Sequence, residues 1–248
     1  LEKTLGLPVE SAVFALLPMM SFAAVGVALD SVDLDPSDKT SLQLGATTYM
    51  DYCMGCHSLK YARYNRVARD LDIPEDEFRA TLMHSDASFG SLMENAMPAK
   101  QSKVWFGITP PDLTLVARLR GNDWLYSYLR GFYADASRPF GVNNLVFKDV
   151  GMPHVLAELQ GVCADKPQMG GHEDRGTHDD GCKKLAVEGT QTKEEYDETV
   201  YDLVNFLAYM GDPNKLERER LGWMVLLFLA VFWFISLLYT RELKKDIH

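Results

Sequence analysis

Basic residues are scarce in this sequence of 248 residues, which has 25 lysines and arginines against 35 aspartates and glutamates. The formal net charge at pH 7 is −10, and the acidic excess lies in the middle of the chain because the charges near its two ends cancel. A domain this acidic is a poor match for a phosphate backbone, so we expect no nucleic-acid partner. Its field would attract a cationic protein, although an acidic surface also serves solubility alone.

Segments of extreme composition are also lacking, since the chain as a whole is 47% hydrophobic and 24% charged. Nothing in it therefore indicates a disordered region. Two apolar stretches take up the ends of the chain, and what remains is roughly 190 residues, enough for one domain or for one domain with insertions.

The longest stretches without charge lie near the two ends. Residues 221–239 read LGWMVLLFLAVFWFISLLY, which as a helix is long enough to cross a bilayer and is flanked by charged residues. Residues 11–29 form a weaker apolar run with small residues around Ala23, which favours a cleaved signal peptide over an uncleaved anchor. The predicted order is a signal peptide over 1–23, an exported domain over 24–215, an anchor over 216–240 and a cytoplasmic tail over 241–248.

Cysteine is used only four times, and two of the four form the motif Cys53-Met54-Gly55-Cys56-His57. C-x-x-C-H is the attachment signature of haem c, in which two thiols add to the porphyrin vinyl groups and the histidine binds the iron. A thioredoxin-like redox site would need a βαβ context that is absent. A zinc site would need a second cysteine pair of similar spacing, and Cys163 and Cys182 do not provide one. We therefore expect one covalently bound haem.

Two amphipathic segments flank the predicted domain. Residues 41–52 read as a short helix that leads into the motif, and residues 193–210 have apolar side chains at helical spacing before Gly211-Asp212-Pro213 ends the pattern. Two terminal helices packed across each other, with the haem motif just after the first, are typical of the cytochrome c fold.

A haem iron that only transfers electrons needs a sixth ligand, and a thioether would raise its reduction potential. Spacing alone leaves Met97 and Met152, each followed by proline, as equal candidates. His154 and His84 are minor alternatives.

The stretch WFGITPPDLTLVARLRGNDWLYSYLRGFY from Trp105, followed by RPFGVNNLVFKDVGMPHVL, resembles cytochrome c1. YMDYCMGCHSLKYARY and the C-terminal helix that leads into a single span share the resemblance, which covers about residues 40–245. C-x-x-C-H occurs in all c-type cytochromes, whereas its combination with P-P-D-L and R-x-R is far more specific. The resemblance implies a mainly α fold: a cytochrome c-like haem domain with long loop insertions and one C-terminal transmembrane helix.

Carried over by position, the resemblance makes His57 the proximal and Met152 the distal iron ligand. Arg120 would pair with a haem propionate, for which its fixed donor fork is suited. The remaining residues that the resemblance places beside the haem are Tyr49, Pro110 and Pro111. Asp112 is expected to cap the helix that carries Arg118 and Arg120, and Gly121 to end it.

The same resemblance implies a subunit of the cytochrome bc1 complex, a dimeric quinol–cytochrome c oxidoreductase of the bacterial inner membrane, with the haem domain in the periplasm. The haem would take electrons from the Rieske iron–sulfur protein and pass them to a cytochrome c. Quinol chemistry would belong to cytochrome b, so no catalytic residue is expected in this chain. The alternatives are a free-standing membrane cytochrome that serves another oxidase or reductase, and a structural module that holds a metal instead of haem.

The polar insertion from Gly161 to Thr190 contains the remaining two cysteines. In an oxidising periplasm, a Cys163–Cys182 disulfide is expected, and it could stabilise the fold by roughly 3 kcal/mol. The rival interpretation is a metal site formed by these cysteines with His172 and His178.

Overall fold

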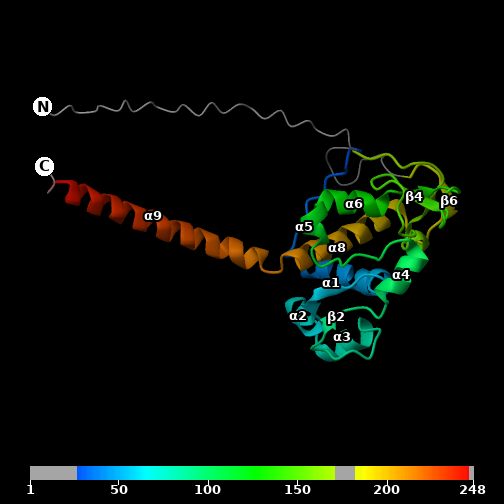
Figure 1. Cartoon of the computed structure of the whole chain (residues 1–248), viewed down its shortest axis with the longest axis horizontal. Coiled ribbons are helices and arrows are strands. Elements are labelled where there is room, and N and C mark those ends of the chain that lie inside the picture. The colour runs from blue at the N-terminus through cyan, green and yellow to red at the C-terminus, as the bar shows by residue number, and fades with distance from the viewer. Residues whose placement is uncertain (1–26, 171–181, 246–248) are drawn as a thin grey trace, which may run out of the picture.

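Two helices from opposite ends of the domain cross at its centre. In the computed structural model, which describes residues 27–170 and 182–245, α1 (Lys39–Thr48) packs against α8 (Lys193–Gly211), as Figure 1 shows. α1 begins at Asp38, whose carboxylate accepts hydrogen bonds from two backbone N–H groups of the first turn. The close approach requires Gly45, because a Cβ atom there would lie 2.0 Å from the carbonyl oxygen of Asp202.

Both predicted terminal helices are therefore present. α8 begins with a capping box between Thr192 and Glu195, and its predicted apolar stripe is buried. α1 ends earlier than the sequence indicated, because residues Tyr49–Cys53 form a π-helical turn, η1.

Shorter elements surround this crossing. β1 (Leu59–Arg63) and β2 (Leu92–Met93) form a small antiparallel sheet. The short helices are α2 (Tyr64–Asp70), α3 (Glu75–Thr81), α4 (Ala99–Phe106), α5 (Val116–Arg120), α6 (Asn122–Arg130) and α7 (Ala157–Gln160). α5 and α6 pack against α8, whereas α4 stands at the edge of the domain (Figure 1).

Part of the predicted insertion forms strands of a second sheet. Four strands run in the order β4-β3-β5-β6, and β5 and β6 lie at the two ends of the insertion. Cys163 and Cys182 form a disulfide, with their Cα atoms 5.4 Å apart. His172 and His178, which the rival metal site would need, lie outside the described residues. The bounds of these strands are β3 (Phe132–Ala134), β4 (Val142–Asn144), β5 (Gly161–Cys163) and β6 (Leu185–Glu188).

A buried ionic cluster holds the chain segment before α1 against the domain. Arg130, at the end of α6, lies 2.6 Å from Asp30 and 2.6 Å from Asp197 of α8. The backbone N–H of Asp30 also donates to the hydroxyl of Ser127 at 2.8 Å. Because buried charges are tolerated only when they are paired, this cluster fixes the path of the chain into the domain.

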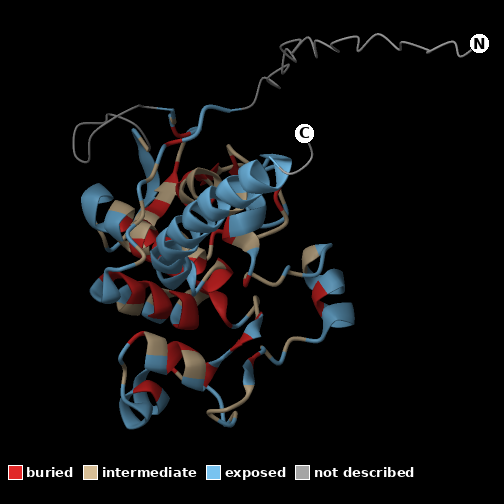
Figure 2. Cartoon of the chain, turned by 90° about the vertical axis from the view of Figure 1, so that its left-hand side faces the viewer, coloured by how far each residue is buried: buried red, intermediate tan, exposed pale blue. Residues whose placement is uncertain are grey.

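The last helix, α9 (Lys215–Lys245), leaves the domain and is exposed along its whole length (Figure 2). It contains an 18-residue window of mean hydropathy 2.5 and, among the described residues, is the one helix long and apolar enough to cross a membrane. A helix that is apolar on all faces needs an apolar environment, which suits a membrane anchor. The fold is thus a mainly helical domain followed by one apolar helix. The predicted signal peptide lies outside the described residues.

Candidate haem site

The π-helical turn η1 places the C-x-x-C-H motif at the edge of the α1–α8 crossing. The backbone N–H of Met54 donates to the carbonyl of Tyr49 at 2.9 Å, which widens the helix by one residue. The N–H of His57 then donates to the carbonyl of Cys53 at 2.8 Å, so that the motif closes into one tight turn. Such π-turns are frequent at functional sites.

One cleft brings most of the predicted site residues together. It has a volume of about 260 Å³ and lies between η1, α5, α6, α8 and the 147–155 segment. Apolar side chains form most of its wall, including Leu203 and Leu207 of α8. The predicted residues that line it are Cys53, Cys56, His57, Pro110, Pro111, Arg120 and Met152. An apolar cleft with a few convergent polar groups is the usual form of a cofactor site.

The His57 ring is oriented for ligation from the cleft wall. Its Nδ1 atom lies 2.7 Å from the carbonyl oxygen of Pro111. Because a carbonyl can only accept, Nδ1 must carry the proton, which leaves Nε2 with a free lone pair. Burial lowers the pKa of His57, and the hydrogen bond to Pro111 opposes this only in part, so the neutral ligand form is favoured.

Neither thiol of the motif is in a disulfide. Burial raises the pKa of Cys53 to about 12 and also raises the pKa of Cys56. Reactive and zinc-binding cysteines need a stabilised thiolate, and here the surroundings favour the protonated thiols. The donor set of two thiols and a neutral imidazole in an apolar cleft therefore fits covalent haem better than a zinc ion or a redox dithiol.

The structure places the candidate sixth ligands in different environments. Met152 lines the cleft, whereas Met97 lines a separate polar cavity next to it. His154 is buried outside the cleft, where Nε2 lies 3.1 Å from the carbonyl of Gly161 and burial lowers its pKa to about 4. His84 pairs with Asp51 at 2.8 Å.

An aromatic stack that the sequence interpretation did not include supports Met152. The hydroxyl of Tyr128 donates to Met152 Sδ at 3.3 Å, and the Tyr128 ring stacks on Trp124 with centroids 4.8 Å apart. The guanidinium of Arg120 lies over Trp124, 5.0 Å from the ring centroid. The i, i+4 spacing of Trp124 and Tyr128 was the available signal, but aromatic pairs at this spacing occur in ordinary cores as well.

Three other expectations have different outcomes. Tyr49 does not line the cleft but supports the motif from behind, since its hydroxyl donates to the carbonyl of His57. The expectation that Asp112 caps the Arg118–Arg120 helix is wrong: α5 begins after Leu115, and the Asp112 carboxylate accepts from the N–H groups of Lys60 and Thr114 instead. Gly121 does end α5, with φ at 91°.

Known protein families and proteins resemble this chain over most of its length. The profile of the Cytochrome C1 family matches residues 84–247, which include the P-P-D-L segment, Met152 and α9 but not the C-x-x-C-H motif. A cytochrome c1 from Allochromatium vinosum is 47% identical, over 96% of this chain and 98% of the relative. A protein named ammonia monooxygenase gamma subunit, from Nitrosomonas europaea, is 45% identical over 90% of each chain.

Other matches are more distant. The cytochrome c1 of Rhodospirillum rubrum is 24% identical, over 85% of this chain and 83% of its own. A chain of a hyperthermophilic respiratory Complex III gives a loose structural likeness, with a TM-score of 0.41 and 16% identity over 88% of this chain and 81% of that one. The fold and cleft are of the kind found in membrane-anchored c-type cytochromes. The chain belongs to the cytochrome c1 family, which implies haem c as its cofactor and electron transfer as its role.

Proposed function

We propose that this chain is the electron-transfer subunit of a cytochrome bc1 complex and carries one haem c, bound through Cys53 and Cys56, with His57 and Met152 as axial ligands. The observation that carries the proposal is that one apolar cleft collects all four of these residues. When bound, a haem held by these residues would supply a one-electron carrier, and the chain would serve between a Rieske iron–sulfur protein and a cytochrome c.

The residues of the chain prepare this site in four ways. The Pro111 carbonyl holds the His57 ring with Nε2 unprotonated, and the Tyr128 hydroxyl holds the Met152 sulfur. Arg120, braced against Trp124, offers a cation to a propionate at the cleft edge. The apolar wall keeps water away and thereby favours a high reduction potential.

The wider organisation follows from the same proposal. Residues 1–23 act as a signal peptide, the haem domain over 24–215 lies in the periplasm, α9 crosses the inner membrane and the tail after residue 240 is cytoplasmic. Cytochrome b supplies the quinol chemistry, and the complex is a dimer. The exposed apolar surface of α9 supports the membrane anchor and a place for neighbouring membrane subunits.

The test is purification of the tagged full-length chain from mildly solubilised native membranes. We expect a c-type haem spectrum, a b-type cytochrome and an iron–sulfur subunit in the same fraction, and inhibitor-sensitive reduction of cytochrome c by quinol. Recovery of a lone c-type cytochrome without quinol activity would replace the proposal with a free-standing electron carrier. Recovery without haem would refute both.

A further inference from the structure

His154 is a buried polar side chain that the proposed haem site does not use. It is 8% exposed and follows Met152 by two residues. Met152, Pro153 and Val155 line the cleft, whereas His154 does not. Its ring instead reaches β5, where Nε2 lies 3.1 Å from the carbonyl oxygen of Gly161. The same short stretch of chain therefore sends one side chain into the cleft and another into the second sheet.

The ring and the backbone of His154 both bind the turn between α7 and β5. Because a carbonyl oxygen can only accept, Nε2 carries a proton and donates it to Gly161, which ends α7 and begins β5. The carbonyl of His154 accepts from the N–H of Ala157, the first residue of α7, at 3.2 Å. A buried imidazole N–H without an acceptor would cost free energy, so the bond to Gly161 fixes where the ring lies.

An aromatic contact connects this ring to the Met152 sulfur. The imidazole stacks on Phe132 of β3, with centroids 4.7 Å apart and an angle of 2° between the ring planes. Phe132 in turn meets the ring of Tyr128 edge-on at 5.4 Å, and the Tyr128 hydroxyl donates to Met152 Sδ at 3.3 Å. These contacts form a closed loop, which runs from Met152 along the chain to His154 and back through the two rings.

The Met152 side chain needs such support from its surroundings. Methionine is unbranched and flexible, so its own rotamers do not fix the sulfur. Residues 151–155 belong to no helix or strand. On the N-terminal side of this stretch, Arg138 donates to the carbonyl of Val150 at 3.3 Å. On the C-terminal side, His154 supplies the corresponding attachment, and groups of this kind orient the ligands of a metal.

We propose that His154 is a positioning residue, which holds the Met152 sulfur in the cleft through its hydrogen bond to Gly161 and its stack on Phe132 and thereby keeps small external ligands from the haem iron. The inference rests on the proposed function and deepens it, because it names the group that fixes the sixth ligand. An apolar residue of the same size would fill the space beside Phe132, but it could not donate to Gly161.

The test is a titration of the oxidised, purified complex with imidazole, which must displace Met152 to reach the iron. Loss of the absorption band of methionine–iron ligation gives the affinity. His154→Phe keeps a ring but removes the donor, and it should bind imidazole about fivefold more tightly, which is the worth of one hydrogen bond. His154→Gln keeps an N–H donor of similar reach and should stay within about twofold of the native affinity.

Phe132→Leu is a second, independent variant. It removes the stack without altering His154, and it should also raise the imidazole affinity about fivefold, because a stacked aromatic pair contributes about as much as a hydrogen bond. The native affinity in either the His154→Phe or the Phe132→Leu variant would overturn the positioning role. So would a rise in His154→Gln as large as that in His154→Phe.

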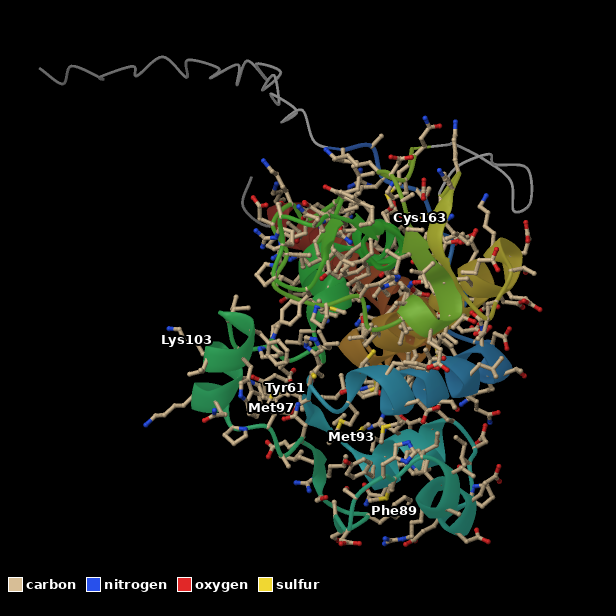
Figure 3. All side chains as sticks on the ribbon, turned by 90° about the vertical axis from the view of Figure 1, so that its right-hand side faces the viewer. Tyr61, Phe89, Met93, Met97, Lys103 and Cys163 are labelled. Atoms are coloured by element: carbon tan, nitrogen blue, oxygen red, sulfur yellow. A yellow bond between two sulfur atoms is a disulfide. The ribbon has the colours of Figure 1, made fainter. Side chains whose placement is uncertain are left out.

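Phe78→Leu is the matched control for a general loss of stability. Phe78 is fully buried in α3 and packs on Phe89, with centroids 5.9 Å apart. Figure 3 shows Phe89 at the opposite end of the domain from Cys163 of β5. This variant should lower the free energy of unfolding and leave the imidazole affinity unchanged, and an equal rise in affinity would overturn the proposal. A native complex that lacks the methionine–iron band would instead refute the ligands of the proposed function.

Discussion

At the scale of single residues, the two methionines that spacing could not separate differ in their surroundings. Met152 lies in the wall of the apolar cleft with a hydrogen bond from Tyr128, and Met97 lies in a polar cavity. Replacement of each by leucine keeps the volume and removes the sulfur. We expect Met152→Leu to lower the reduction potential by about 0.1 V or more, within the range that axial ligation sets, and Met97→Leu to leave it nearly unchanged. Redox titration of both variants checks this, and the opposite ranking would refute Met152 as the ligand.

The hydrogen bond from Tyr128 to the Met152 sulfur should change the reduction potential less than the loss of Met152 itself does. A donor to the methionine sulfur withdraws electron density from the iron and so favours the reduced state. Tyr128→Phe should lower the potential by roughly 20–60 mV, which is the worth of one hydrogen bond converted for a single electron. The absorption band of methionine–iron ligation should persist. Tyr126→Phe is the control, because the Tyr126 ring lies against Arg130 and not in the cleft. A shift of the potential by the same amount in this variant would contradict the role of the Tyr128 hydrogen bond.

At the scale of elements, the α1–α8 crossing depends on a residue without a side chain. A methyl group at Gly45 would collide with backbone atoms of Asp202, which cannot move without separating the helices. Gly45→Ala should therefore lower the free energy of unfolding by about 3 kcal/mol, the upper end for overpacking. Gly90→Ala is the control, because its added Cβ atom would have its nearest neighbour at 3.9 Å. Urea unfolding of the two variants should differ clearly; equal stability would contradict the packing.

The ionic cluster around Arg130 is a second feature whose loss should measurably lower the free energy of unfolding. Arg130→Gln would leave the buried carboxylate of Asp30 and the half-buried carboxylate of Asp197 without their cation, which should cost about 3 kcal/mol. It should also free the chain before α1, so limited proteolysis should cut around residue 30 sooner. Arg79→Gln breaks an exposed pair with Glu75 and should cost less than about 1 kcal/mol. Similar losses in both variants would show that burial of the cluster is unimportant.

At the scale of the whole molecule, we expect the haem domain and α9 to act independently, the domain in holding the haem and α9 in attachment to the membrane. No residue of α9 is buried against the domain. A chain ending at Asn214 should therefore be released from the membrane with an unchanged haem spectrum and potential. It should no longer purify with its membrane partners. Fractionation and redox titration of the truncated chain check this, and a shifted potential would show that α9 supports the haem site.

The sequence by itself determined the features that depend on residues close together along the chain. C-x-x-C-H, the charge-free run before Tyr239 and the helical spacing of apolar residues after Lys193 depend only on near neighbours along the chain, and so they could be read directly. The family resemblance selected Met152 over Met97 and added Arg120 and the prolines.

Only the tertiary structure decided which distant side chains share one cleft. It separated Met97 from Met152, moved Asp112 from a helix cap to a contact with β1, and placed Tyr128 against the Met152 sulfur. These features arise from contacts between segments far apart in sequence, whose positions are set by the packing of the whole core rather than by local propensity.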